Sequence, residues 1–300
     1  MSVSSKKTVA CIPAYNEESS IAKVVMLASK FVDAVVVCDD GSSDLTGEIA
    51  SRMGAIVVMH DRNLGYGAAL RSLFSKAEEL GADAVVTLDG DGQHLPSDIS
   101  AIMTPVLSGE ADLVIGSRFL GSSDAPNYRV VGVRAATALV RGATGLDVSD
   151  AQSGFRAYSQ KALRSIEITD DGMGASVEIL QKAVQVGLKV VEVPVNIRYD
   201  VENPSTHNPL FQFATVIAST IKHTSISHPL IFYGLPGGIL ILVGLVTGFV
   251  DLSAYTGRHG YVSVGYTMLT LGALTLGLVL AMTGITLFTV INVVRESRSR

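Results

Sequence analysis

The chain has 300 residues, of which 48% are hydrophobic and only 17% are charged, and its formal net charge is −5. Soluble domains typically carry about 25% charged residues. The shortage is concentrated near the C-terminus, because only Asp251 and Arg258 are charged between positions 229 and 294. This composition excludes a disordered chain, a small disulfide scaffold and a wholly soluble protein. Residues 1–228 keep an ordinary charge density and are numerous enough to bury a sizeable core.

The distribution of charge indicates which binding partners are not expected, and the cysteines indicate the cellular compartment. The chain contains no long basic run, so nucleic acid is not an expected partner. Cys11 and Cys38 both lie in apolar runs, VACI and VVVC, which is typical of buried thiols in a reducing compartment. Residues 1–18 lack the apolar stretch of a signal peptide. We therefore expect the N-terminal domain to be cytoplasmic.

Short β-branched runs alternate with amphipathic stretches over the first 116 residues. The runs TVACI, AVVVC, AIVVM, AVVTL and DLVIG predict strands over 8–12, 34–38, 55–59, 84–88 and 112–116. Helices are predicted between them over 21–30, 45–53, 67–80 and 99–107. This rhythm is typical of an α/β fold in which helices cover both faces of a largely parallel sheet.

The pattern becomes less regular beyond this point. The expected elements are a basic helix over 128–141, a turn-rich segment at DAQSGFRAY (150–158), a helix over 175–186 and a strand over 189–197. Aromatic and polar residues are mixed over 209–228, which predicts an amphipathic helix at a membrane interface.

Two uncharged stretches follow, over 230–250 and 261–294. Each exceeds the roughly 20 residues needed to cross a bilayer, so spans are predicted at about 230–250 and 265–292. Lys222 precedes the first span and RESRSR follows the second, so the positive-inside rule predicts that both ends are cytoplasmic. The near-absence of charge disfavours the alternative of an apolar helix pair buried in a soluble core.

We therefore expect a multi-pass integral membrane protein in three parts. Residues 1–208 would form a cytoplasmic domain, 209–228 an interfacial helix, and 229–300 a transmembrane hairpin with a basic cytoplasmic tail. A homo-oligomer is compatible with this organisation.

Polar residues follow the predicted strands, at the edge where ligands bind in such sheets. In LDGDGQH (88–94), the carboxylates of Asp89 and Asp91 and the amide of Gln93 can converge directly after a strand. Oxygen ligands of this kind suit Mg²⁺ or Mn²⁺, with waters and a diphosphate completing the octahedron. The alternative for this segment is a solvated acidic turn.

Three other segments are expected at the same ligand-binding edge of the sheet. IPAYNEE (12–18) contributes Pro13, Tyr15 and Glu17, and DDGSSD (39–44) contributes acids that can accept hydrogen bonds from a base or ribose. The alternative for DDGSSD is a turn and helix cap. NLGYGAAL (63–70) contains G-x-G, but Leu70 replaces the third glycine of a dinucleotide fingerprint, which disfavours an NAD site.

The motifs IPAYNEE, DDGSSD, NLGYGAAL, LDGDGQH, GSRF and DAQSGFRAY stand in an order and spacing that resembles the family-2 glycosyltransferases. Within that family the chain looks like the dolichyl- or polyprenyl-phosphate hexose synthases (dolichol-phosphate mannose synthase type), over about residues 8–200. The resemblance implies a GT-A fold, a Rossmann-like mixed sheet that binds a nucleotide sugar. It also implies a divalent metal, Mg²⁺ or Mn²⁺, and inversion at the sugar carbon.

The resemblance also implies roles for individual residues. The nucleotide-sugar contacts would be Pro13, Tyr15, Glu17, Asp39, Asp40, Asp89, Gly90, Asp91, Gln93, Arg198 and Ser205. The metal ligands would be Asp89, Asp91 and Gln93. The groups that act on the reacting phosphates would be Asp91, Arg118, Arg129 and Arg134, with the three arginines near the acceptor phosphate.

Two positions depart from the family pattern. Val133 stands where a serine usually precedes the arginine that Arg134 matches. NPSTHNP (203–209) retains Ser205 of a loop over the donor but lacks its lysine, and His207 is a candidate substitute. Asp150 could orient the acceptor or sugar hydroxyls, or could simply form a turn.

The chemistry of a lipid phosphate agrees with this interpretation. Its second pKa is about 6, so at neutral pH the nucleophile is already an oxyanion and needs no side-chain base. The site must then supply positioning and positive charge. We expect inverting transfer of a hexose from a nucleotide sugar, of the GDP-mannose or UDP-glucose type, to a polyprenyl or dolichyl phosphate, which yields a lipid-linked donor for glycosylation.

Two alternatives remain open. A processive polysaccharide synthase shares the GT-A fold and carries membrane helices, but such enzymes have a Gln-x-x-Arg-Trp motif and this chain contains no tryptophan. A non-catalytic membrane module that binds a nucleotide sugar would be favoured by loss of the DGD acids or of the GSR arginine. Both are present.

Overall fold

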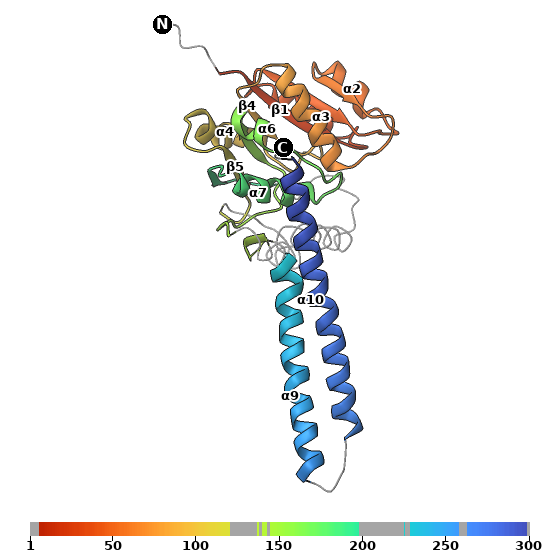
Figure 1. Ribbon diagram of the computed structural model, residues 1–300. Helices are drawn as coiled ribbons and strands as arrows, with labels where there is room; N and C mark the ends of the chain where they lie inside the picture. Colours follow the sequence, from red (N-terminus) through yellow and green to blue (C-terminus); the bar gives the residue numbers. More distant parts are fainter. Residues whose placement is uncertain are drawn as a thin grey trace. The chain divides into compact units, whose positions relative to one another are not determined.

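The computed structural model describes residues 6–120, 137, 140–142, 145–197, 225, 229–257 and 263–298 (Figure 1). The chain divides into two compact units, Met1–Thr220 and Ile221–Arg300. Most of the predicted basic segment 128–141 and of the predicted interfacial helix 209–228 lies outside the described residues.

A seven-stranded mixed sheet forms the centre of the first unit (Figure 1). Its strands are β1 (Thr8–Ala14), β2 (Ala34–Asp39), β3 (Ile56–Met59), β4 (Ala84–Thr87), β5 (Leu113–Ser117), β6 (Arg156–Ser159) and β7 (Val190–Pro194). They lie in the order β3-β2-β1-β4-β6-β5-β7, and only β6 is antiparallel to its neighbours, β4 and β5. The predicted α/β fold with a mixed sheet is confirmed.

Helices cover both faces of this sheet. They are α1 (Ile21–Ala28), α2 (Thr46–Arg52), α3 (Tyr66–Glu79), the 3₁₀ turn η1 (Pro96–Asp98), α4 (Ile99–Leu107), α6 (Gln160–Ser165) and α7 (Ala175–Gln185). Side chains alternate along each strand, so Val9 and Cys11 of β1 pack with α3, α6 and α7, whereas Ala10 and Ile12 pack with α1, α2 and α4. Cys11 and Cys38 are buried free thiols, as predicted.

Strand β6 lies in the segment for which the sequence predicts turns. The sequence pattern did not predict this strand because it contains Arg156, and a charged residue rarely occupies the centre of a buried sheet. Its guanidinium is buried and donates to the Ser176 carbonyl oxygen at 2.9 Å and the Ala151 carbonyl oxygen at 2.7 Å. Helix α6, which was also not predicted, follows at once, and the Ser159 hydroxyl caps it by accepting the Ala162 N–H at 3.1 Å.

Glu178 on α7 anchors the loop that precedes this helix. Its buried carboxylate accepts the backbone N–H groups of Thr169 at 3.0 Å and Asp170 at 2.8 Å. Burial alone would raise the pKa of Glu178, but hydrogen bonds from Lys182, Thr169 and Asp170 hold it below its usual value. The anchored loop carries Asp171, whose carbonyl oxygen accepts the Gly67 N–H in the first turn of α3 at 2.8 Å.

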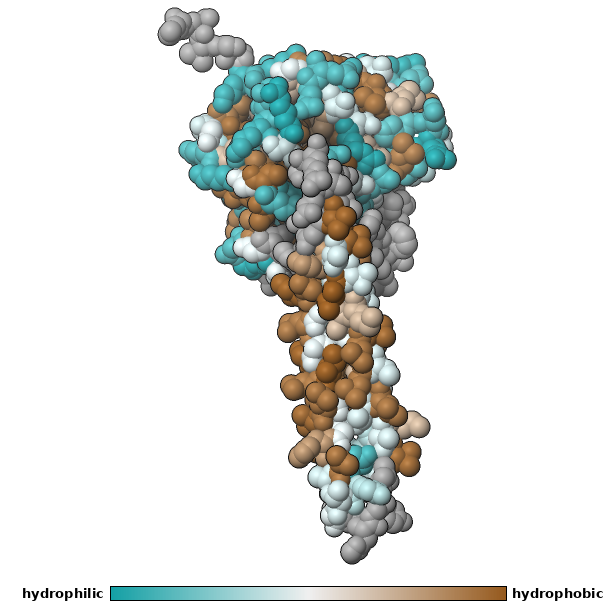
Figure 2. All heavy atoms as spheres, viewed as in Figure 1, coloured by the Kyte–Doolittle hydropathy of each residue, from teal (hydrophilic) through white to brown (hydrophobic). Residues whose placement is uncertain are grey.

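Two long apolar helices form the second unit. The π-helical segment η2 (Leu230–Gly234) leads into α9 (Leu235–Gly257), and α10 (Val264–Arg298) follows. The stretches Leu230–Gly257 and Val264–Ile291 are long and apolar enough to cross a membrane, with mean hydropathies of 2.1 and 2.2. On the face visible in Figure 2, hydrophobic side chains alternate with residues of intermediate hydropathy along these helices. Both helices extend beyond the predicted spans.

Helices α9 and α10 pack against each other as the predicted hairpin, and small residues line their contact. A Cβ atom on Gly237 would lie 2.8 Å from the Gly277 carbonyl oxygen, and one on Gly277 would lie 2.8 Å from the Gly237 carbonyl oxygen. The hydroxyls of Thr247 and Thr270 are 2.9 Å apart across the same contact. Glycine lets helix backbones approach closely, as it does between membrane helices.

We expect Glu178→Gln to lower the free energy of unfolding by about 1.5–3 kcal/mol near pH 7, the range for hydrogen bonds to a charged group. Because the folded-state pKa of Glu178 is lowered, its stabilisation is present above the unfolded pKa and is lost as the pH falls through the folded pKa. The difference in Tm between wild type and variant should therefore shrink in acid, as measured by circular dichroism of the detergent-solubilised chain.

The matched control is Glu79→Gln, which removes an exposed partner of Lys76. Exposed pairs contribute about 0–1 kcal/mol, so this variant should melt close to the wild type. Equal stability of Glu178→Gln and Glu79→Gln at neutral pH would contradict the anchoring role.

Candidate functional site

The carboxyl ends of the parallel strands β1, β2, β4 and β5 carry most of the predicted site residues. These residues are Pro13, Tyr15, Glu17, Asp39, Asp40, Asp89, Gly90, Asp91, Gln93 and Arg118. Because these strands are parallel to one another, the structure brings the loops after them to one edge of the sheet. Arg129, Arg134, Arg198, Ser205 and His207 lie outside the described residues.

The loops after β1 and β2 are joined by hydrogen bonds. Asn16 has a φ of 57°, a left-handed conformation that asparagine tolerates better than most residues. In this conformation its N–H donates to the Ser42 hydroxyl at 2.9 Å, and its side-chain oxygen accepts the Ser43 N–H at 2.8 Å. The Glu17 N–H donates to the Thr46 hydroxyl at 2.7 Å. The two loops therefore form one fixed wall of the site.

Asp39 is the last residue of β2, and its carboxylate lies between the following loop and the first turn of helix α2. One carboxylate oxygen accepts the Ser42 N–H at 2.9 Å. The other faces Gly47, where a Cβ atom would lie only 2.5 Å away. A glycine in the first turn of α2 is therefore required for this carboxylate to keep its place.

Asp40 holds the loop after β3. Its carboxylate accepts hydrogen bonds from His60 Nδ1 at 2.6 Å, the Leu64 N–H at 2.9 Å and the Gly65 N–H at 2.8 Å. The structure thus gives Asp40 a positioning role. Its contact with a nucleotide stays a prediction.

The loops after β1 and β4 carry three acids that lie close enough to affect one another's pKa. Burial, together with the nearby charges of Asp91 and Asp89, raises the pKa of Glu17 to about 7. Burial raises the pKa of Asp89 to about 6, although Arg118 and Arg156 lower it. The pKa of Asp91 is raised by burial and then by Asp89. Mutual repulsion of this kind is common at functional sites and favours a bound cation.

The acidic loop after β4 lies close against the end of β1. A Cβ atom on Gly90 would lie 3.3 Å from the Pro13 carbonyl oxygen, so this position favours glycine. The Gly90 carbonyl oxygen is 2.7 Å from the hydroxyl of Ser20, which also lies 3.0 Å from a Glu17 carboxylate oxygen. Ser20, which is not among the predicted site residues, joins the two loops that carry the acids.

His94 fixes the same loop from within. Its Nδ1 atom accepts the Asp89 backbone N–H at 3.2 Å, which puts the ring proton on Nε2. Burial lowers the pKa of His94 to about 4, so the ring is neutral at physiological pH. The Gln93 N–H donates to the Asp91 carboxylate at 2.9 Å and closes the turn.

The donor set fits a hard divalent cation. Asp89, Asp91 and Gln93 offer only oxygen ligands from one short loop, as Mg²⁺ and Mn²⁺ prefer. Within the part of the chain that the structure describes, no group of three or more His, Cys, Asp or Glu side chains could hold a metal ion. An ion held by two carboxylates would leave coordination positions for a substrate and water.

Arg118, just after β5, is fixed by a fully buried carboxylate. Its Nε and Nη2 donate to the two oxygens of Asp150 at 2.5 and 3.2 Å. The Asp150 and Ser149 N–H groups in turn donate to the Glu192 carboxylate at 3.0 and 2.8 Å. Asp150, whose role the sequence leaves open, is a positioning residue here. The sequence analysis did not single out Glu192. The only feature that marks it is its position as a lone acid in the apolar run VVEVP.

Gly154 lets β6 approach the acids. A Cβ atom there would lie 2.8 Å from an Asp89 carboxylate oxygen and 3.1 Å from the Tyr66 hydroxyl. Arg156 follows two residues later, and its buried Nε has no hydrogen-bond partner. Its charge lowers the pKa of Asp89, as Arg118 does. Sequence reasoning missed both Gly154 and Arg156, because they stand in the segment interpreted as turns.

Residues 9–167, just over half of the chain, match the family model described as Glycosyl transferase family 2. The chain belongs to this family. It is a glycosyltransferase, as the order of its motifs predicts.

Curated relatives of this glycosyltransferase are named for lipid phosphates. The UDP-N-acetylglucosamine–dolichyl-phosphate N-acetylglucosaminyltransferase of Methanococcus voltae is 33% identical over 63% of this chain and 84% of its own. The polyprenol monophosphomannose synthase of Mycolicibacterium smegmatis is 31% identical over 63% and 77%. The dolichyl-phosphate hexose transferase of Haloferax volcanii is 34% identical over 61% and 79%. The expected resemblance to the dolichyl- and polyprenyl-phosphate synthases is therefore confirmed.

Solved structures confirm the GT-A fold. Glucosyl-3-phosphoglycerate synthase from Mycobacterium tuberculosis, solved with Mn²⁺, uridine diphosphate and glucosyl-3-phosphoglycerate, has a TM-score of 0.59 and 26% identity. The match covers 74% of this chain and 81% of that one. A structure of the same enzyme with Mg²⁺ and uridine diphosphate has a TM-score of 0.58 and 26% identity, over 74% and 80%.

We expect Asp150→Asn to lower kcat/KM for glycosyl transfer by about 10- to 150-fold. The change removes the charge that orients Arg118, and a charge-assisted hydrogen bond is worth about 1.5–3 kcal/mol. Steady-state kinetics of the purified protein measures the effect. The control is Glu48→Gln, which removes the exposed partner of Arg52 and should leave the kinetics unchanged. Wild-type kinetics for Asp150→Asn would show that Arg118 needs no such partner.

Proposed function

We propose that the chain transfers a hexose from a nucleotide sugar, of the GDP-mannose or UDP-glucose type, to a polyprenyl or dolichyl phosphate. The product would be a lipid-phosphate-linked sugar with inverted configuration at its anomeric carbon. The observation that carries the proposal is one strand edge on which the acids Glu17, Asp89 and Asp91 stand beside the fixed cation Arg118. The names of the curated relatives support the same substrates.

The acids form the donor half of the site. Asp89, Asp91 and Gln93 would hold Mg²⁺ or Mn²⁺, which neutralises charge on the departing diphosphate when it is bound. The nucleotide would lie against the wall formed by the first two loops, where Pro13 and Asp39 stand. The remaining proposed donor contacts are Tyr15, Glu17, Asp40, Gly90, Arg198 and Ser205.

The arginines form the acceptor half. Arg118, Arg129 and Arg134 would hold the lipid phosphate, and an arginine fork suits phosphate oxygens in a planar, bidentate geometry. A phosphate oxygen attacks the anomeric carbon, and the bond from that carbon to the diphosphate breaks on the opposite face, which inverts the configuration. The incoming phosphate is largely ionised at neutral pH because its second pKa is about 6. The side chains therefore position and neutralise charge, and they need not remove a proton.

The two alternatives have less support. A processive polysaccharide synthase would need its tryptophan motif, and the chain has no tryptophan. A non-catalytic binding module does not need an arginine fixed by a buried carboxylate beside the acids.

A donor screen tests the proposed reaction. Purified protein is incubated with Mn²⁺, a short polyprenyl phosphate, and GDP-mannose, UDP-glucose or UDP-N-acetylglucosamine in turn. We expect an organic-extractable glycolipid from one donor of the first two types. Polymer formation would favour the synthase, and donor binding without any product would favour the binding module.

Asp91→Asn should lower turnover by at least about a hundredfold, or about 2.7 kcal/mol of transition-state stabilisation. The change keeps the side-chain volume but removes a negative charge from a proposed metal ligand. EDTA should have the same effect on the wild type, and isothermal titration with Mn²⁺ should show weaker binding to the variant. Asp61→Asn, an exposed change in the loop after β3, is the control. Full activity of Asp91→Asn in metal-free buffer would refute the metal assignment.

We also propose that α9 and α10 cross the membrane and leave the catalytic domain on the cytoplasmic side. A cysteine in place of Ser253, near the end of α9, should react with an impermeant thiol reagent only from the outer or lumenal face. A cysteine in place of Ser100, exposed on α4, should react only from the cytosol. Background labelling should be low because both native thiols are buried. Labelling of both positions from one face would rule out this topology.

A further inference from the structure

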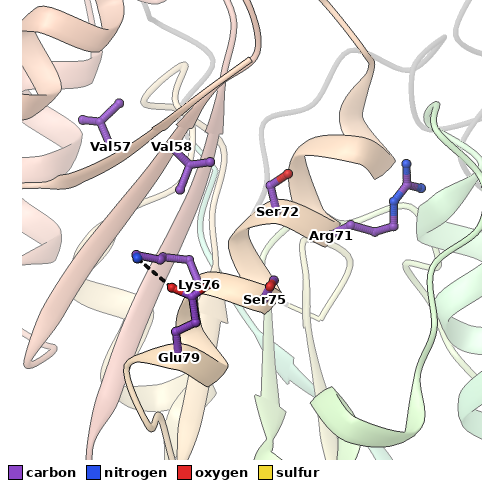
Figure 3. A pocket seen from close by; sticks show the side chains of 7 residues that line it. All are labelled: Val57, Val58, Arg71, Ser72, Ser75, Lys76 and Glu79. Atoms are coloured by element: carbon purple, nitrogen blue, oxygen red, sulfur yellow. Dashed lines mark hydrogen bonds and ion pairs between the residues drawn. The ribbon is translucent and has the colours of Figure 1, made fainter. Parts of the chain in front are cut away.

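A groove of about 520 Å³ lies between the edge strand β3 and helix α3, apart from the acids of the strand edge. It is lined by Val57, Val58, Arg71, Ser72, Ser75, Lys76 and Glu79. Figure 3 shows Val57 and Val58 on β3 and Ser72, Ser75 and Lys76 on α3, where Ser75 and Lys76 follow Ser72 by about one turn. Of the two valines, Val58 packs on the α3 side of the sheet and Val57 packs on the other side. The groove has an apolar side and a side with hydroxyls and a cation. Nothing in the proposed glycosyl transfer uses it.

A chain of hydrogen bonds leads from the protein interior to this groove. His60 Nδ1 lies 2.6 Å from a carboxylate oxygen of Asp40, and His60 Nε2 lies 2.8 Å from the hydroxyl of Ser72. The side chains of Asp40 and His60 are only 6% and 10% exposed, whereas Ser72 lines the groove. The order carboxylate, imidazole, hydroxyl is the arrangement that activates serine nucleophiles.

The direction of these hydrogen bonds follows from Asp40. Its carboxylate already accepts the N–H groups of Leu64 and Gly65 at 2.9 and 2.8 Å, which fixes it as an acceptor. His60 must then donate from Nδ1, so Nε2 is the acceptor and the Ser72 hydroxyl is the donor. A base that accepts the hydroxyl proton is what a nucleophilic serine needs. Cys38 lies 3.6 Å from Nε2, but burial raises the pKa of its thiol to about 12, so it remains protonated.

We propose that Ser72 is an activated nucleophile and that the groove accepts a carboxylic ester, which gives the chain a second reactive site that shares only Asp40 with the proposed donor site. The Ser72 oxygen bonds to the ester carbonyl carbon while its proton passes to His60 Nε2. The carbon–oxygen bond to the alcohol then breaks, and the alcohol leaves with the proton from His60. Asp40 touches no substrate and holds the imidazole in the required tautomer.

Lys76 provides charge for the oxyanion of this step. It stands four residues after Ser72 on the same face of α3, about one helical turn away. Its ammonium is paired at 2.7 Å with Glu79, whose side chain is 60% exposed. Exposed pairs of this kind are worth about 1 kcal/mol or less, so the ammonium can turn toward a bound anion at little cost.

A fluorophosphonate probe tests the nucleophile on the full-length protein, with peptide mass spectrometry to locate the label. We expect Ser72 to be labelled at least about a hundredfold faster than Ser75, which lines the same groove one turn away. This comparison needs no variant and so does not depend on how any variant folds. Equal rates at the two serines, or no label on Ser72, would overturn the proposal.

Variants then test the hydrogen-bonded series Asp40–His60–Ser72 and the reaction with an ester. With p-nitrophenyl acetate, we expect a burst of one p-nitrophenol per chain in the wild type and in Ser75→Ala, and none in Ser72→Ala. His60→Gln should slow the burst at least about tenfold. EDTA should leave the burst unchanged, which separates this site from the proposed metal-dependent transfer. A burst of equal size in Ser72→Ala would overturn the proposal even if glycosyl transfer is established.

Discussion

Carboxylates that accept the N–H groups of two consecutive residues organise the loops of this glycosyltransferase. Asp40 binds Leu64 and Gly65 in this way, Glu178 binds Thr169 and Asp170, and Glu192 binds Ser149 and Asp150. Asp40 and Glu178 are buried, and a buried charge is costly unless it is hydrogen-bonded, so these two acids require their loops as much as the loops require the acids. Asp40 directly follows β2, Glu178 lies on α7 and Glu192 lies on β7, so both strands and helices supply the acids around which the loops close.

The same device links the fold to the chemistry. Glu192, on the edge strand β7, holds the backbone of Asp150, and the Asp150 carboxylate orients Arg118. Separate contacts hold the other side chains nearby, because the Glu17 carboxylate contacts the Ser20 hydroxyl and the Asp91 carboxylate accepts the Gln93 N–H. Burial raises the pKa values of Glu17 and Asp89, and repulsion from Asp91 and Asp89 also raises that of Glu17; a bound cation would favour the charged forms.

The periodicity of the sequence predicts the regular elements well. The strands and helices from β1 to β5 lie within a few residues of their predicted bounds, because each has an apolar pattern that only one face of the sheet can bury. β6 was missed because it begins at the charged residue Arg156 and follows Gly154, a combination that is more typical of a turn than of a buried strand. The acidic site itself was visible, since Asp89 and Asp91 follow a buried strand directly.

The hydrogen bonds between these carboxylates and the loops could not be predicted in the same way. Glu192 and Ser149 are 43 residues apart, and Asp40 and Leu64 are 24 apart. No local pattern marks such pairs, because an isolated Glu in a strand and an isolated Asp in a turn each have several ordinary explanations. Only the strand order β3-β2-β1-β4-β6-β5-β7 brings the partners together.

The contact between Gly237 and Gly277 belongs to an inner surface of the hairpin that differs from its outer surface. The backbones touch along a line of small residues, and large side chains such as Leu242 and Phe249, 63% and 72% exposed, point outward. Changes in outward side chains therefore leave the contact between the helices intact. A hairpin built in this way can adapt its outer surface to bilayers of different thickness or lipid composition while its internal geometry stays constant.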